Sequence, residues 1–201
     1  VTDVEAFDFL PGQFVKVEMP IHEDPAKCSR SYSIASRPDG SNRIEFAIVR
    51  LEGGAGTAWL FDQAKPGDTV RISDPMGRMV LPHAEDRGPI AEDMVFIATG
   101  TGVGPFRSML LDLKAHPRLH RDLHLVFGCR TQEHLLYADE FRQLERELDG
   151  FHYHPTLSRQ AVEGLEQGYV HPVDERLVQG RHGGEDLRFF ICGWGDMINE
   201  A

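Results

Sequence analysis

A glycine-rich turn between an apolar run and an amphipathic stretch is the first place where this chain could bind an anion. The apolar run covers residues 94–98, the turn covers Thr99 to Pro105, and Pro105 suits the first position of a following helix. Glycines let the backbone approach a ligand closely, and free N–H groups at a helix start favour negative charge. The pyrophosphate of a dinucleotide is the natural ligand. The turn lacks the ending of a P-loop and the simple GxGxxG pattern with its acidic partner.

Two stretches nearer the N-terminus could also bind phosphate. In the segment 30–34, Arg30 could contact two phosphate oxygens, and Tyr32 offers a ring for stacking and a hydroxyl for a sugar. The segment 53–57 is a glycine-rich turn that ends in a hydroxyl at a short helix start. Each has a plainer interpretation, a half-exposed strand for the first and a mobile loop for the second.

Polar and small residues also follow three further apolar runs, each of which is predicted to be a strand. Ligands of open parallel sheets bind at the carboxyl ends of the strands. With the glycine-rich turn, four strand ends carry such residues, and we expect these ends to line one site. The residues at the other three ends are Gly128 and Arg130, Ser158 and Arg159, and Cys192 and Gly193.

The elements that must position these residues divide into two kinds. Up to about Leu81 the chain shows short alternating runs between turn residues, which is typical of a small antiparallel barrel. Strands are predicted at 14–18, 44–49 and 70–72, and 56–61 looks like the only helical piece.

Beyond the polar segment 82–89 the pattern changes to alternating strands and helices, so the domains are predicted at 1–86 and 87–201. A doubly wound parallel sheet is expected there. Its first strand is the apolar run before the glycine-rich turn, and three more are predicted at 123–127, 151–157 and 187–191. Two amphipathic helices are also predicted. The apolar face of the first carries Phe106, Met109, Leu110 and Leu113, and that of the second carries Tyr137, Phe141, Leu144 and Leu148. Val1 is not a methionine and Ala201 falls at a helix start, so both ends look incomplete.

Composition excludes several classes of protein. A net charge of −11 argues against nonspecific binding to nucleic acid or anionic membranes. Three distant cysteines suggest neither a disulfide framework nor an iron–sulfur cluster. No apolar run is long enough to span a bilayer and no signal peptide is visible, so a cytoplasmic location is expected. The ten histidines show no HExxH motif and are interpreted as solvated surface residues, with no metal site expected.

In this order along the chain, the motifs resemble those of the ferredoxin–NADP⁺ reductase family of flavoproteins. The flavin signature Arg-x-Tyr-Ser matches Arg30, Tyr32 and Ser33, and the second flavin motif matches 53–60. The nicotinamide-dinucleotide motif is similar to Thr99–Pro105. Cys192 and Gly193, followed by Met197, are similar to the family's terminal Cys-Gly-x-x-x-Met. The resemblance covers essentially the whole chain.

The resemblance implies a Greek-key antiparallel barrel that binds FAD, followed by a doubly wound α/β domain that binds NADP(H). Arg30 would hold the FAD pyrophosphate, Tyr32 would pack on the isoalloxazine or contact the ribityl chain, and Ser33 would donate a hydrogen bond near flavin N5, which accepts the hydride. The second flavin motif would support the pyrophosphate through Gly54, Ala55, Gly56 and Thr57.

The resemblance also implies a nicotinamide site. The pyrophosphate of the second dinucleotide would lie on Thr99, Gly100, Thr101, Gly102, Gly104 and Pro105. Cys192 would lie beside the nicotinamide, with Gly193 and Met197 in the same motif. Ser158 and Arg159 match the family's Ser-Arg, and with Arg130 they favour the 2′-phosphate of NADPH.

The expected activity is hydride transfer between NADP(H) and FAD, with single electrons exchanged with a small carrier such as ferredoxin or flavodoxin. One alternative is an NADH-dependent reductase component of an oxygenase system. A second, from another class, is a regulatory module that binds a dinucleotide without turnover. On that second alternative the segment 30–34 is a plain strand.

Overall fold

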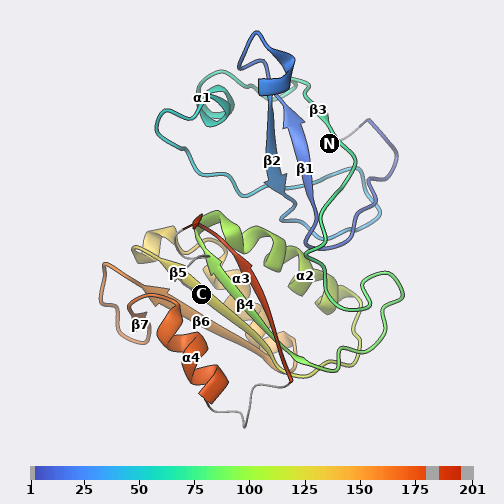
Figure 1. Cartoon of the computed structure of the whole chain (residues 1–201). Helices are drawn as coiled ribbons and strands as arrows, with labels where there is room; N and C mark the ends of the chain where they lie inside the picture. The colour runs from blue at the N-terminus through green and yellow to red at the C-terminus, as the bar shows by residue number, and fades with distance from the viewer. Residues whose placement is uncertain (1–2, 180–185, 196–201) are drawn as a thin grey trace.

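The computed structural model describes residues 3–179 and 186–195, and it has two parts (Figure 1). The N-terminal part is built on a small antiparallel sheet, and the C-terminal part on a larger parallel sheet with helices on its faces. Among the described residues, no helix is both long enough and apolar enough to cross a bilayer. The observed order of antiparallel and then parallel structure agrees with the predicted order.

The N-terminal sheet has three strands in the order β2-β1-β3. They are β1 (Phe14–Glu18), β2 (Ser29–Ser33) and β3 (Arg71–Ile72), and both pairings are antiparallel. Alternation along β1 turns Val15 and Val17 into a core that also holds Ile34, while Lys16 and Glu18 are exposed. Isolated bridges Phe14↔Met76 and Ile34↔Phe46 extend the sheet.

Two predictions for this part were wrong in detail. No continuous strand forms at 44–49, where only Phe46 makes a backbone bridge, although its side chain packs on the core as the alternation suggests. The helix α1 (Ala55–Asp62) is also not the only helical piece, because a 3₁₀ turn covers Pro25–Lys27. Asp24 caps that turn by accepting a hydrogen bond from the N–H of Ala26.

The C-terminal sheet has five parallel strands in the order β7-β6-β5-β4-β8. The two central strands, β4 and β5, are buried along almost their whole length, as expected for a sheet covered on both faces. β8, the last of the described strands, lies beside β4, the first strand of this sheet, so β4 is paired on both sides. The strands are β4 (Asp93–Thr99), β5 (Leu123–Cys129), β6 (Phe151–Leu157), β7 (Glu166–Gln167) and β8 (Leu187–Cys192).

Helices cover the two faces of this sheet. The helices α2 (Gly104–Ala115) and α3 (Ala138–Glu147) pack on one face, where Phe106 and Phe141 join a core with Phe96. The helix α4 (His171–Gln179) packs on the other face, where Val173 lies with Val126. Short 3₁₀ turns, Gly100–Val103 and Gln132–His134, precede α2 and α3. The doubly wound arrangement predicted from the sequence is therefore present.

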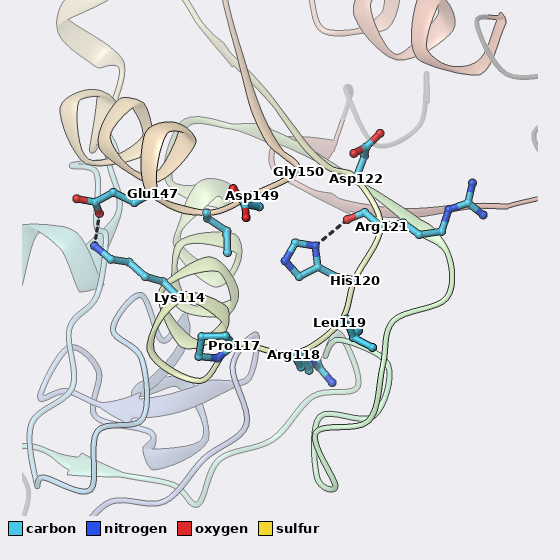
Figure 2. Close-up of a pocket in the computed structure, with 11 residues that line it drawn as sticks. Lys114, Pro117, Arg118, Leu119, His120, Arg121, Asp122, Glu147, Asp149 and Gly150 are labelled. Atoms are coloured by element: carbon cyan, nitrogen blue, oxygen red, sulfur yellow. Dashed lines mark hydrogen bonds and ion pairs between the residues drawn. The ribbon is translucent and has the colours of Figure 1, made fainter.

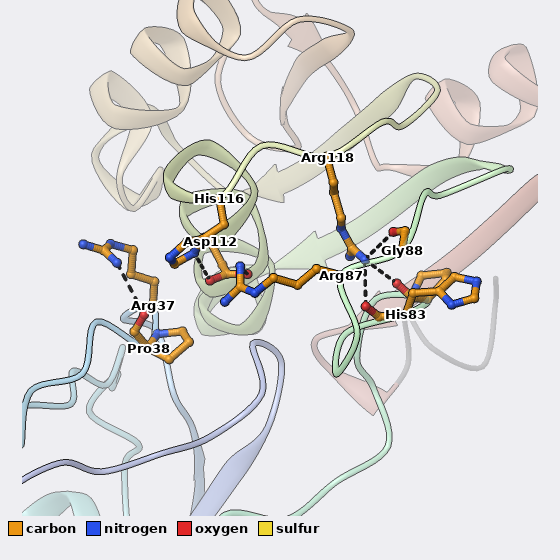
Figure 3. Close-up of polar contacts among 9 residues, drawn as sticks. Arg37, Pro38, His83, Arg87, Gly88, Asp112, His116 and Arg118 are labelled. Atoms are coloured by element: carbon orange, nitrogen blue, oxygen red, sulfur yellow. Dashed lines mark hydrogen bonds and ion pairs between the residues drawn. The ribbon is translucent and has the colours of Figure 1, made fainter.

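The segment between the two parts is tied to the end of α2 (Figure 3). A single nitrogen of Arg118 donates to the carbonyl oxygens of Pro82, His83 and Gly88, at 2.8 to 2.9 Å. Arg87 pairs with Asp112, which also contacts the ring of His116. The polar, turn-rich segment that the sequence suggests as a boundary is thus a connection pinned by side chains.

The histidines of the parallel sheet differ from the prediction. His124 is only 6% exposed, and its ring stacks on those of His152 and His154. Burial, followed by the charges of His152 and His154, lowers the pKa of His124 to about 4. The interpretation of all ten histidines as solvated was therefore wrong, because alternation on two adjacent strands places these three on one face, beneath α4.

Candidate functional site

The strand β2 carries the residues that the sequence assigns to the flavin. Arg30 is exposed, and one of its nitrogens donates to the carbonyl oxygens of Lys27 and Ser29, at 3.0 and 2.8 Å. Tyr32 is half-buried against Phe46, and burial, outweighing the charge of Arg30, raises its pKa. The hydroxyl of Tyr32 is therefore protonated and able to donate a hydrogen bond at neutral pH.

The start of α1 lies directly against Arg30 and Tyr32. A Cβ atom on Gly56 would be 3.1 Å from Cγ of Arg30 and 3.6 Å from the Tyr32 hydroxyl, so only glycine lets the two motifs approach this closely. Gly54 is the N-cap and no side chain caps the helix, so the N–H groups of Ala55 and Gly56 are donors for an anion. The arrangement fits a pyrophosphate held between Arg30 and the helix start.

Thr57 makes hydrogen bonds within the turn that precedes α1. Its hydroxyl lies 3.1 Å from the carbonyl oxygen of Gly54 and 3.2 Å from that of Leu51, and it accepts a hydrogen bond from the Leu51 N–H. The side chain therefore holds the turn before α1 in shape. In this structure the backbone of the turn, rather than this hydroxyl, presents the donors.

The glycine-rich turn after β4 packs on the end of β8. A Cβ atom on Gly102 would be 2.6 Å from the carbonyl carbon of Cys192 and 2.9 Å from Cα of Gly193, distances at which backbone must move. Trp194 donates from its backbone N–H to the Thr99 hydroxyl at 3.2 Å. The structure thus brings together the glycine motif and the Cys-Gly pair that the sequence had placed 90 residues apart, about half the chain.

The remaining predicted residues continue the same edge of the sheet. Gly128 lies between Thr99 and Thr156, because a Cβ atom on it would be 3.5 Å from the Thr99 methyl group and 3.4 Å from the Thr156 hydroxyl. Beyond the strands, the Arg159 N–H donates to the carbonyl oxygen of Arg130 at 2.9 Å. Both arginine side chains are exposed. Two cationic side chains therefore lie just beyond the carboxyl ends of β5 and β6, and arginine is well suited to bind phosphate.

The two thiols at this edge are protonated at neutral pH. Burial raises the pKa of the Cys192 thiol. Burial also raises the pKa of Cys129, to about 11, although a backbone hydrogen bond from Gly100 acts to lower it. A protonated Cys192 is a poor nucleophile. Its place beside Gly102 suits a compact group that fills space next to a ligand.

The two domains touch where the chain leaves β2 and where α2 begins. Gly104 opens α2 directly against Ala35 and Ala47, since a Cβ atom on it would be 3.5 and 3.8 Å from their Cβ atoms. One turn of the helix further, the Ser108 hydroxyl donates to the carbonyl oxygen of Ser36 at 2.6 Å. Ala35 lies two residues after Ser33, so the chain that leaves β2 reaches the start of α2 directly.

Arg107 fastens this interface, and sequence reasoning did not single it out. One of its nitrogens donates to the carbonyl oxygen of Ala35 and to Glu45, both at 2.9 Å, while two others contact Glu140 at 2.5 and 3.1 Å. Its guanidinium lies 4.4 Å from the centre of the Tyr137 ring. Burial alone would lower the pKa of Arg107, but the carboxylates of Glu140 and Glu45 outweigh it and raise the pKa.

We expect Arg107→Met to lower the free energy of unfolding by about 2 to 3 kcal/mol, because it removes a guanidinium that is only 12% exposed and leaves the carbonyl oxygen of Ala35 and the carboxylate of Glu140 without their partner. Urea-induced unfolding followed by tryptophan fluorescence would measure the change. Arg50→Met is the matched control, because Arg50 forms an equally short two-pronged pair with Asp62, but on the exposed surface. A loss below about 1 kcal/mol is expected there. Equal losses in both variants would contradict the role of Arg107.

One predicted residue lies outside the described part of the chain, and a neighbouring residue was not predicted. Met197 lies outside the described residues. Trp194, which is 59% exposed, was missed; a Cβ atom on Gly100 would be 3.6 Å from its indole nitrogen. Its position directly after Cys192-Gly193 at a strand end was the signal that could have found it.

A separate hollow lies at the opposite edge of the sheet (Figure 2). It measures about 490 Å³ and is bounded by the segments 114–122 and 147–150, which precede β5 and β6. Lys114 pairs there with Glu147. Because the candidate residues gather at the carboxyl ends of the strands, this hollow is not part of the candidate site.

Comparisons with known proteins agree with this geometry. A family model described as an oxidoreductase FAD-binding domain matches residues 2–81, and one described as an oxidoreductase NAD-binding domain matches residues 96–201. The chain is 40% identical over 203 residues to "Ferredoxin--NADP reductase B" of Sorangium cellulosum, with 98% of this chain and 79% of that protein covered.

Two further relatives show the range of similar proteins. The chain is 30% identical to the "Anthranilate 1,2-dioxygenase electron transfer component" of Acinetobacter baylyi, covering 97% of this chain and 53% of that protein. A crystal structure of a ferredoxin NADP⁺ reductase from Neisseria gonorrhoeae, with bound FAD and NADP, superposes with a TM-score of 0.78 at 24% identity. That match covers 99% of this chain and 79% of the other, and it shows that the two share a fold.

Proposed function

Because this chain belongs to the family of FAD- and NAD(P)-dependent oxidoreductases that includes the ferredoxin–NADP⁺ reductases, we propose that it transfers hydride between NADP(H) and FAD. We further propose that it exchanges single electrons with a small carrier protein such as ferredoxin or flavodoxin. The FAD domain corresponds to residues 1–86 and the NADP(H) domain to residues 87–201 in this proposal.

One observation carries the proposal. The backbone that follows the Arg-x-Tyr-Ser strand touches the helix that follows the glycine-rich turn, through Ala35 and Gly104. Hydride transfer needs the donor and acceptor atoms held about 3 to 3.5 Å apart in a fixed orientation. Two separate binding modules would not need the end of the Arg-x-Tyr-Ser strand to meet the helix that follows the glycine-rich turn. An oxidoreductase that passes a hydride between two bound dinucleotides does.

On the flavin side, the proposed work of the protein is to bind and orient. FAD, when bound, supplies the conversion between two-electron hydride transfer and one-electron transfer. Arg30 and the N–H groups of Ala55 and Gly56 hold its pyrophosphate, and Tyr32 packs on or beside the ring system. Ser33 donates a hydrogen bond where negative charge develops near flavin N5. The close approach of Gly56 to Arg30 supports this assignment.

On the nicotinamide side, the glycine turn binds the pyrophosphate and the strand ends set orientation and specificity. Thr99, Gly100, Thr101, Gly102 and Gly104 supply close backbone approach, and Pro105 starts α2. The protonated thiol of Cys192 fills the space beside the nicotinamide and excludes water. Outside that turn, the 2′-phosphate of NADPH is assigned to Ser158, Arg159 and Arg130.

The test is anaerobic stopped-flow reduction of the bound flavin, with equal concentrations of NADPH and NADH in separate runs. We expect NADPH to be preferred. Arg159→Ala should lower the ratio of second-order rate constants, NADPH over NADH, by about 10- to 100-fold, because a charge-assisted contact contributes about 1.5 to 3 kcal/mol. The rate with NADH should change little, since NADH lacks the phosphate.

Arg142→Ala is the matched control for Arg159, because Arg142 is another accessible arginine, 41% exposed, whose pair with Asp139 is long, at 3.5 Å. It should leave the ratio unchanged. An unaltered ratio in Arg159→Ala would remove that residue from the 2′-phosphate site. Faster reduction by NADH in the unaltered protein would favour the second candidate function, an NADH-dependent reductase component of an oxygenase system.

Similarity to the anthranilate dioxygenase component is the observation that favours this second candidate. The chain spans about half the length of that relative. A regulatory module without turnover predicts a colourless protein, or bound flavin that NADPH and NADH both fail to reduce. The electron-carrier partner and the cytoplasmic location remain predictions, which reduction of ferredoxin or flavodoxin by the purified protein and fractionation of cells would check.

A further inference from the structure

A cluster of imidazole and carboxylate side chains lies near the amino ends of β5 and β6, away from both candidate cofactor sites. His124 and His152 are direct neighbours in the parallel register, and His154 follows two residues later on the same face. Asp122 immediately precedes β5. In Figure 2 its carboxylate points away from His120 and the hollow. The proposed oxidoreductase activity uses none of these residues.

Three of these side chains converge. One ligand atom from each of Asp122, His124 and His152 lies within 4.8 Å of the other two. Oδ1 of Asp122 is 3.7 Å from Nε2 of His152. Ligands about 2.0 to 2.1 Å from a tetrahedral Zn²⁺ are about 3.3 Å from one another. The side chains of Asp122 and His152 are 44% and 45% exposed, so the His152 ring has room to turn out of its stack on His124 and bring a ring nitrogen to that separation.

His124 is the fixed member of the group. Its Nδ1 lies 3.2 Å from Nε2 of His154, and its ring centre is 4.8 Å from that of His152. A contact of one imidazole nitrogen with a neighbour sets the tautomer and orientation of a ring whose other nitrogen binds a metal. The contact between Nδ1 and His154 therefore orients the His124 ring.

From this geometry we propose that Asp122, His124 and His152 form a binding site for a divalent transition-metal ion of the Zn²⁺ type, with His154 as the residue that orients His124. Two imidazoles and one carboxylate suit Zn²⁺ and its neighbours, whereas Mg²⁺ and Ca²⁺ prefer oxygen ligands alone. Water completes the coordination. The bound ion ties the amino ends of β5 and β6 together.

The charges around the cluster are compatible with a cation. Glu166 and Arg176 face His154 and pair with each other, so they add no net charge. Arg121 pairs with Asp93 at 3.2 Å and with Asp186 at 2.7 Å. The nearest arginines are thus held in ion pairs of their own.

Isothermal titration of the FAD-loaded, chelator-treated protein with ZnCl₂ tests the proposal. We expect one saturable site with a Kd of about 1 µM or tighter, and a rise in unfolding temperature as Zn²⁺ is added. His152→Gln should weaken binding by more than about 100-fold, beyond the roughly 10- to 100-fold typical of losing a supporting contact. Asp122→Asn is a second variant, and thermal unfolding without metal checks that both fold.

His116→Gln is the matched control, because His116 is exposed to 43% and lies beside Asp112, much as His152 lies beside Asp122. It should leave Zn²⁺ affinity unchanged. The proposal is overturned if no saturable binding occurs, which would leave the three rings as a stacked, hydrogen-bonded group. It is also overturned if His116→Gln weakens binding as much as His152→Gln, or if Mg²⁺ binds as tightly as Zn²⁺.

Discussion

Replacement of Gly102 with alanine is expected to reduce the rate of flavin reduction by NADPH by about 100-fold or more, with FAD still bound. The added Cβ atom would meet the backbone of Cys192 and Gly193 at 2.6 and 2.9 Å. Backbone cannot rotate away as a flexible side chain can, so the turn or the end of β8 must move. A displacement of about 1 Å at a hydride-transfer site is enough for such a loss.

Stopped-flow reduction at saturating NADPH measures this rate, and the flavin absorbance spectrum measures FAD content. Overpacking of this kind also costs about 1 to 3 kcal/mol of stability, which thermal unfolding would report. Gly195→Ala is the control, because Gly195 follows the same strand and a Cβ atom on it meets nothing within 4 Å. If Gly102→Ala reduces flavin at the normal rate, the turn does not position the nicotinamide.

The second large effect is expected for Arg30→Ala, which should weaken FAD binding by about 10- to 100-fold. A charge-assisted hydrogen bond contributes about 1.5 to 3 kcal/mol, and Arg30 is the cation that lies against the start of α1. Stability should change little, because the side chain is exposed and its observed partners are only carbonyl oxygens. Titration of the flavin-free protein with FAD, followed by flavin fluorescence, gives the Kd.

Two further variants sharpen this result. Arg71→Ala removes an arginine from β3, where the side chain is 82% exposed and lies 3.8 Å from Glu18, and it should not alter the Kd for FAD. Arg30→Lys keeps the charge but loses the two-pronged geometry, so an intermediate Kd is expected. Unchanged affinity in Arg30→Ala would remove that residue from the flavin site.

Much of the fold was predictable because its patterns are local. The apolar run before the glycine turn is β4, and the periodic apolar residues after it form the buried face of α2. The prediction of a strand at 44–49 was wrong because alternation reports which side chains face the core, not whether the backbone finds a partner. Phe46 is packed, yet it makes only one bridge.

The candidate site was predictable at its strand ends and not at its interface. Gly102 and Cys192 could be placed at the same edge from the parallel topology alone. Arg107 could not be found this way, because nothing in the sequence distinguishes it from other helical arginines. Its partners Ala35 and Glu140 come from distant segments of the chain. His124 was misjudged for the same reason: the rings that it stacks on, those of His152 and His154, lie about 30 residues later in the chain.

The place of β8 has a consequence for synthesis of the protein on the ribosome. β4 leaves the ribosome well before β8, the strand that pairs with its second edge. Until β8 emerges, β4 offers an open row of N–H and C=O groups within a strongly apolar strand, which is the kind of edge that recruits other chains. The antiparallel domain can form meanwhile. The edge formed by the carboxyl ends of the parallel strands can be completed only after Cys192 has left the exit tunnel.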